Sequence, residues 1–250
     1  MELMPGGGWN EAPGYWNYAF QFFNYSFATM NSAFGTDYGL TRSMGMESTL
    51  DFAISTLGAY GTNNFHDAGI SVGVNSYSAF AYLARRFRNK TAFEMRLGDI
   101  KTRRATPGIE DVLFYCPELY EDVETNPKTV NYTEGIELFS VRDSMDSAES
   151  SFFFSTHFGT TSGYHQHTDT SAFVLDMYDI RWAEDLGSEN YNLQNEQGYG
   201  DNDLYRKRGE GHNIIVINPA KYGPTHYENG MPKGAQKEQV NNKFIPIARR

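Results

Sequence analysis

The chain has 250 residues, enough for one large domain or two smaller ones, and 40% hydrophobic residues supply material for real cores. The formal net charge of −10 argues against nucleic acid as a partner, because phosphate binding requires a basic surface. The only cysteine, Cys116, excludes an intrachain disulfide. The sequence contains no apolar run of the length that predicts a membrane span.

The first hundred residues are predicted to be mainly helical. The segment 14–34 has no proline, and its aromatic residues recur at spacings of three and four, which indicates a helix. Because Tyr15 and Tyr18 belong to one aromatic face and Trp16 and Phe20 to another, we expect this helix to be buried on most sides. Further helices are predicted over 46–59, 76–88 and 91–97.

From about residue 109 the apolar runs become short and are separated by Gly, Asn, Asp and Ser, which indicates β-strands. The predicted strands cover 112–115, 135–142, 151–158, 171–177, 180–186 and 213–218, with a weak one at 244–247. Helices followed by strands predict an α+β protein. We therefore divide the chain into a helical segment, 1–105, and an antiparallel β-domain, 106–250.

Histidine and aspartate gather in the second half of the chain. His165, His167 and Asp169 occupy alternate positions, so an extended segment would place them on one face. Together with Asp185 and His212, the two histidines could form a tetrahedral zinc site. The alternative is a hydrogen-bonded polar network on one face of a sheet.

Strand parity raises a difficulty for this zinc site. A two-residue turn at 178–179 would pair Leu175 with Trp182, which puts Asp185 on the face opposite His165 and His167. A β-bulge, or an irregular stretch after His167, would be needed to bring these side chains together.

Three weaker patterns could also carry chemistry. Tyr15 and Tyr18 lie at the start of the first predicted helix near Glu11, where a tyrosine could transfer protons, although tyrosines are also common in cores. The pair His66 and Asp67 lies in a glycine-containing loop and could be catalytic or merely exposed. The basic run 205–208 could bind an acidic substrate, or it could be a solvated turn.

Four short motifs follow one another in the second half of the chain. The segment 163–176 contains a His-x-His-x-Asp and then a Phe-containing strand. The segment 181–191 contains an Asp-x-Gly before a Tyr, and 211–218 contains a His-Asn. This order resembles the C-terminal pattern of the heparinase II/III-like family of polysaccharide lyases. The segment 7–18 is similar to the family's glycine, Glu-Gly-Pro and Tyr-Trp-x-Tyr segment, and 65–69 resembles a loop of the family. The resemblance covers about residues 5–220.

The resemblance implies the C-terminal part of an (α/α) toroid followed by an antiparallel β-sandwich, truncated at both ends. Family members cleave uronic-acid-containing polysaccharides, such as heparan sulfate or alginate, by β-elimination. Their Asn-His-bearing helix lies upstream of the Tyr segment, so we expect this chain alone to be inactive or very weak. The start of the chain lacks the features of a signal peptide, but the resemblance implies a periplasmic or secreted full-length parent.

The resemblance also implies roles for individual residues. His165 would be the catalytic histidine of the β-domain and Tyr15 the catalytic tyrosine, with Tyr18 in reserve. The ligands of a structural zinc would be His167, Asp185 and His212. The residues expected to contact the acidic glycan are Glu11, Trp16, Arg206 and Arg208.

Two other functions remain open at this point. One is a non-catalytic carbohydrate-binding or structural module with a structural zinc, and the other is a zinc-dependent hydrolase, which would need an open metal position and a general base. A cleft shared by His165 and Tyr15 or Tyr18 would favour the lyase over the binding module.

Overall fold

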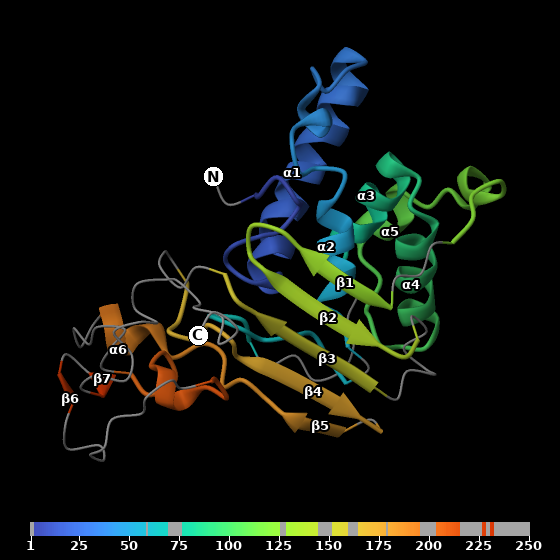
Figure 1. Cartoon of the computed structure of the whole chain (residues 1–250). Helices are drawn as coiled ribbons and strands as arrows, with labels where there is room; N and C mark the ends of the chain where they lie inside the picture. The colour runs from blue at the N-terminus through green and yellow to red at the C-terminus, as the bar shows by residue number, and fades with distance from the viewer. Residues whose placement is uncertain are drawn as a thin grey trace.

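The computed structural model describes residues 3–58, 60–69, 77–125, 129–144, 152–159, 165–178, 180–195, 204–215, 227–228 and 231–232. Helices come first along the chain and strands follow (Figure 1). The helical elements of the first half are α1 (Pro13–Phe34), η1 (Leu40–Arg42), α2 (Thr49–Ser55), α3 (Ala79–Phe87), α4 (Lys90–Lys101), α5 (Ile109–Leu113) and η2 (Pro117–Tyr120).

The second half forms a five-stranded antiparallel sheet whose strands lie in sequence order. The strands are β1 (Val130–Thr133), β2 (Leu138–Arg142), β3 (Phe152–His157), β4 (Phe173–Met177) and β5 (Ile180–Ala183). The short elements α6 (Tyr191–Asn195), η4 (Gly209–Gly211), β6 (Tyr227–Glu228) and β7 (Met231–Pro232) follow. The predicted α+β class, with helices before an antiparallel sheet, is confirmed.

Helix α1 begins at Pro13, whose missing N–H costs nothing in a first turn, and ends at Gly35, whose φ of 71° suits glycine. Its inner face carries Trp16 and Phe20, both fully buried. Its other aromatic face is exposed, with 63% of Tyr18 accessible to solvent. The prediction that this helix is buried on most sides is therefore wrong.

The other predicted helices correspond to α2, α3 and α4, with ends displaced by a few residues. The predicted strand 112–115 is wrong, because Ile109–Leu113 forms helix α5, which begins with two acidic residues in its first turn. Residues 213–215 are not in a strand, and 216–218 and 244–247 lie outside the described residues. Helical elements continue to Tyr120, and the division of the chain near residue 105 stays a prediction.

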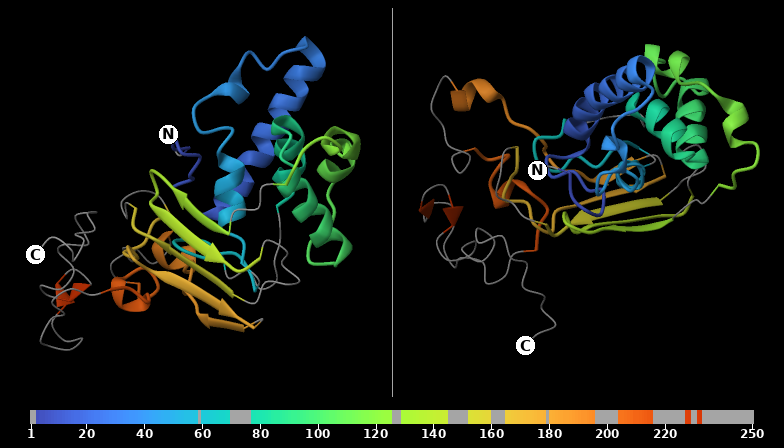
Figure 2. Two further views of the ribbon diagram at one scale, coloured as in Figure 1. Left: turned by 45° about the vertical axis from the view of Figure 1, so that its right-hand side comes forward. Right: turned by 90° about the horizontal axis from the view of Figure 1, so that it is seen from above.

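The helices pack on one face of the sheet (Figure 2). A single buried cluster joins Trp16 and Phe80 of the helices to Phe153 and Val174 of the sheet. The opposite face of the sheet is more open, since Trp182 is 65% exposed. This packing brings the start of α1 close to the loops at the ends of the strands, where the candidate site lies. No helix within the described residues is long and apolar enough to cross a membrane.

Candidate active site and two metal-ligand clusters

Three segments far apart in the sequence meet beside the start of α1. The backbone N–H of Asp67 donates to the carbonyl of His165 at 3.0 Å, and the backbone N–H of Ser188 donates to Ala68 at 3.2 Å. The side-chain amide of Asn64 donates to the carbonyl of Asp185 at 2.6 Å. The loop 64–68 is thus held between the segments 165–169 and 185–188.

Gly187 makes this close approach possible. Its φ is +63°, and a Cβ atom at this position would overlap the carbonyl oxygen of Ala68. We expect Gly187→Ala to lower the free energy of unfolding by about 2 kcal/mol, because the left-handed backbone and the overlap both disfavour a side chain. Denaturant unfolding measures this loss. The control is Gly98→Ala in helix α4, where a Cβ meets nothing within 4 Å; that variant should be slightly more stable than the wild type.

Tyr15 and His165 lie face to face in the structure. Their ring centroids are 4.0 Å apart and their planes differ by 22°. The Tyr15 hydroxyl is 2.6 Å from the hydroxyl of Tyr191, which donates to Oδ2 of Asp67 at 2.9 Å. Nδ1 of His165 is 3.1 Å from the same Oδ2. Tyr191 and His165 therefore share one carboxylate, and Tyr15 reaches it through the Tyr191 hydroxyl. The His165 side chain remains 31% exposed.

Asp67 is the buried centre of this network. Burial alone would raise its pKa, but the hydrogen bond and charge of His167, the charge of Lys207 and the hydrogen bond from Tyr191 together hold that pKa well below its ordinary range. Nζ of Lys207 lies 3.3 Å from Oδ1 of Asp67. Burial, together with hydrogen bonds to Tyr15 and Asp67, raises the pKa of Tyr191 far above its ordinary value. At neutral pH the network therefore holds a carboxylate and a protonated Tyr191.

The first metal-ligand cluster consists of His167, Asp185 and His212, all buried, with one donor atom of each within 4.8 Å of the others. Nδ1 of His212 is 2.6 Å from Oδ2 of Asp185, and Nε2 of His167 is 2.8 Å from Oδ1 of Asp67. Nδ1 of His167 is buried without a hydrogen-bond partner among the described residues. A histidine held by a carboxylate on one ring nitrogen, with the other nitrogen unpartnered, fits a metal ligand.

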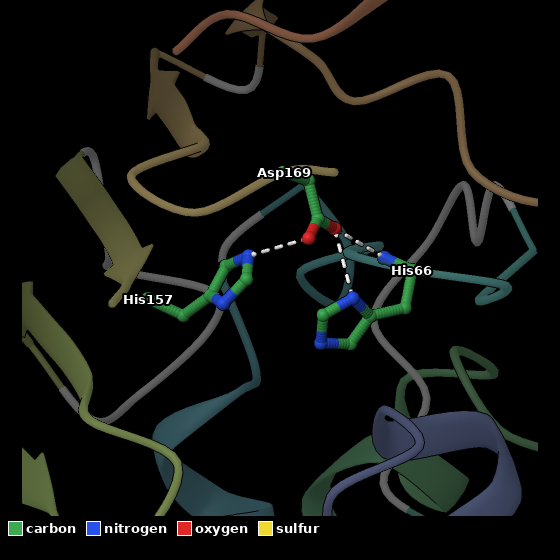
Figure 3. Close-up of side chains that lie close together, drawn as sticks. All are labelled: His66, His157 and Asp169. Carbon is green, nitrogen blue, oxygen red and sulfur yellow. Dashed lines mark hydrogen bonds and ion pairs between the residues drawn. The ribbon is translucent and has the colours of Figure 1, made fainter. Parts of the chain in front are cut away.

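The second cluster consists of His66, His157 and Asp169, which also offer donor atoms within 4.8 Å of one another (Figure 3). The described part of the chain thus has two buried His/Asp clusters that could bind a metal. The prediction that His165, His167 and Asp169 share one face is wrong. His165 belongs to the network around Asp67, whereas His167 belongs to the first metal-ligand cluster and Asp169 to the second. The backbone explains this, since the segment is not a strand and His165 and Ser171 have φ values of 63° and 72°.

This irregular backbone also removes the parity difficulty. The predicted pairing of Leu175 with Trp182 is wrong, because Leu175 pairs with Ala183 and the register shifts between Leu175 and Asp176. Strand β5 ends at Ala183, so Asp185 lies in the following loop and its side chain is free of the strand alternation. Asp185 can therefore reach His167 and His212.

The remaining predicted residues are distributed as follows. Trp16 cannot contact a glycan, because it is fully buried and its indole N–H donates to Thr49 at 2.8 Å, so that prediction is corrected. Tyr18 packs edge-to-face on Phe22, and Tyr15 is the tyrosine that stacks on His165. Contacts between a glycan and the other three residues, Glu11, Arg206 and Arg208, stay predictions. Glu11 is half-buried. Arg206 donates to the carbonyl of Leu186, and Arg208 pairs with Glu210.

The sequence does not assign three members of the network to their roles. The pair His66 and Asp67 is a candidate for catalysis, but nothing in the sequence indicates that Asp67 joins His165 to Tyr191, and Tyr191 stands only in a motif of the resemblance. Lys207 was hidden in the basic run 205–208, although it is buried. A run of consecutive basic residues such as Arg-Lys-Arg gives no signal that its middle residue points inward.

The fold is similar to those of heparan sulfate lyases. The heparan sulfate lyase HepC from Pedobacter heparinus is 15% identical with a TM-score of 0.53, and its mutant is 14% identical with a TM-score of 0.52; each match covers 74% of this chain and 26% of the other. A protein described as heparinase III, the BT4657 gene product, is 14% identical over 86% of this chain, with a TM-score of 0.55. This chain spans 26% to 30% of the length of these structures. No family model and no curated protein matches the chain.

Proposed function

With a heparinase-III-like fold as the premise, we propose that the chain carries part of the active site of a polysaccharide lyase that cleaves uronic-acid-containing glycans by β-elimination. The stacking of Tyr15 on His165 is the observation that carries this proposal. The two residues come from the helical half and the β half of the chain, and the lyase function requires both in one site. In the proposed fold, the helical half is the end of an (α/α) toroid and the sheet is one layer of a β-sandwich.

β-Elimination removes the proton at C5 of a uronate and expels the oxygen at C4. Asp67 accepts a hydrogen bond from Nδ1–H of His165, which leaves Nε2 as the basic nitrogen that takes the C5 proton. The Tyr15 hydroxyl donates to the hydroxyl oxygen of Tyr191, because the Tyr191 hydroxyl is itself the donor to Asp67. The Tyr15 hydroxyl then protonates the departing C4 oxygen.

The structural metal implied by the family would be held by His167, Asp185 and His212. Nδ1 of His167 is buried and has no hydrogen-bond partner in the part of the chain that the structure describes, which supports this assignment. A bound zinc would supply rigidity rather than Lewis-acid chemistry, because its ligand His167 lies two residues after His165 on the same segment. Asp67 orients both histidines, Nδ1 of His165 and Nε2 of His167, so one carboxylate connects the metal cluster to the proton-transferring group.

We expect His167→Ala to lose zinc and to unfold at a lower temperature, with any catalytic rate lost in proportion to the folded fraction. Metal analysis and thermal unfolding measured on the same samples test this expectation. A variant that keeps its melting temperature but loses turnover would favour the zinc-dependent hydrolase instead, since a catalytic metal contributes to the reaction directly.

Incubation with heparan sulfate and with alginate tests the proposed function. We expect a slow rise in the ultraviolet absorbance of the unsaturated uronide with one of these glycans, and no rise with a neutral glucan. A strong rise would contradict the expectation that the chain alone is weak. Saturable glycan binding without any unsaturated product would favour a carbohydrate-binding module over the lyase.

The second candidate is a carbohydrate-binding module. The exposed aromatic face of α1 favours it, because Tyr18 and Phe22 are 63% and 56% exposed and could stack on sugar rings. Replacing Tyr18 with Ala would then abolish glycan binding, whereas the lyase proposal predicts that binding depends on residues around His165.

A further inference from the structure

The second cluster is built by three separate parts of the chain. His66 comes from the loop after α2, His157 is the last residue of β3, and Asp169 lies between β3 and β4 (Figure 3). Their exposed fractions are 7%, 3% and 0%, so the three polar side chains are removed from solvent. Buried polar groups of this kind are stable only when their donors and acceptors are satisfied.

The cluster does not satisfy all of them. Oδ2 of Asp169 accepts the backbone N–H of His66 at 3.0 Å and lies 2.9 Å from Nδ1 of His66. Oδ1 of Asp169 and Nε2 of His157 face each other at 3.4 Å, and neither has a hydrogen-bond partner among the described residues. Leaving such buried atoms unsatisfied is destabilising. A ligand that binds both atoms would remove this cost.

A divalent transition metal fits these atoms. Two ligands of a tetrahedral zinc, each about 2.0–2.1 Å from the ion, lie about 3.4 Å apart, which is the observed separation of Oδ1 and Nε2. Nδ1 of His66 supplies a third donor. In the metal-bound state the lone pair of this Nδ1 would face the ion in place of the backbone N–H of His167, which lies 3.5 Å away.

Space for a fourth ligand lies beside the two histidines. His66 and His157 line a cavity of about 20 Å³ under the start of α1. A water molecule needs about 10–15 Å³ of such volume. Two imidazoles, one carboxylate and one water complete a four-coordinate set with a net ligand charge that suits a divalent cation.

We propose that His66, His157 and Asp169 form a second zinc-class metal site. It shares no residue with the cluster of His167, Asp185 and His212, and the family resemblance assigns a metal only to that other cluster. The two clusters are neighbours, with 6.4 Å between the ring centroids of His66 and His167. The second metal would fasten the loop that carries Asp67 to the end of β3. This proposal does not depend on lyase activity.

The test counts the zinc ions that remain bound after the folded chain is stripped with a chelator, reloaded with zinc chloride and dialysed. We expect two ions per chain for the wild type and one for His157→Gln. The matched variant in the other cluster, His167→Gln, should also retain one, and the double variant none. One ion in the wild type, kept in His157→Gln and lost in His167→Gln, would overturn the second site, and so would no ion at all.

Two further measurements protect this test against a variant that fails to fold. Asp169→Asn keeps the side-chain shape and should also reduce the count from two ions to one. Titration of the stripped wild type with cobalt(II) should increase the visible ligand-field absorbance through two equivalents. Saturation at one equivalent in the folded wild type would overturn the proposal without any variant.

Discussion

The Tyr15→Phe variant is expected to form unsaturated product at least about 100-fold more slowly than the wild type, because a positioned proton donor contributes about 10²–10⁴-fold to such reactions. The change removes only the hydroxyl that bonds to Tyr191 at 2.6 Å, and the phenyl ring can still stack on His165. Initial rates with heparan sulfate at saturating concentration, followed by ultraviolet absorbance, measure the effect.

Tyr18→Phe is the matched control. It also removes a tyrosine hydroxyl, but from an exposed ring that lies one helical turn after Tyr15. Its rate and its thermal unfolding should equal those of the wild type. Circular dichroism and melting temperature of Tyr15→Phe should also be close to wild type, because the lost hydrogen bond lies at a partly exposed position. Equal rates for Tyr15→Phe and Tyr18→Phe would remove Tyr15 from the reaction.

The largest effect on stability is expected for Asp67→Ala, which should lower the free energy of unfolding by about 3–5 kcal/mol. The side chains of Asp67 and Lys207 are only 1% and 4% exposed, so the variant leaves a buried ammonium group without its carboxylate. It also removes the acceptor of Tyr191 and the partner of His167. Denaturant unfolding at neutral pH measures the loss.

The control for this variant is Asp122→Ala. Asp122 is paired with Arg88 at 2.6 Å, but these side chains are 78% and 50% exposed, so the loss should not exceed about 1 kcal/mol. The double variant Asp67→Ala, Lys207→Met should recover part of the stability lost by Asp67→Ala, because it also removes the buried ammonium group that Asp67 neutralises. Similar losses for Asp67→Ala and Asp122→Ala would contradict the central role of Asp67.

Much of the fold could be predicted from the sequence because its signals are local. The aromatic spacing of 14–34 and the short apolar runs of β3 and β4 depend on neighbours within one element. The prediction of a strand at 112–115 is wrong because a local signal can be ambiguous: a short apolar run does not distinguish a strand from a helical turn. The hairpin pairing failed because the register shift between Leu175 and Asp176 leaves no mark in the residue pattern.

The site was only partly predictable. The resemblance placed Tyr15 and His165 in one site, although 150 residues separate them, and the structure brings them into contact. It could not show that Asp67 joins this pair to His167, because that role depends on three loops that meet in space. The cluster of His66, His157 and Asp169 was invisible for the same reason, since no two of its members are close in the sequence.

The most direct test of the proposed chemistry follows the proton that His165 would remove. A heparan sulfate substrate deuterated at C5 of its uronates is incubated with the chain, and the deuterium released to water is measured together with the unsaturated product. The account predicts that deuterium and product appear together, more slowly than product forms from the undeuterated glycan, and that His165→Ala abolishes both. Glycan that binds without releasing deuterium, or equal release by His165→Ala, would contradict it.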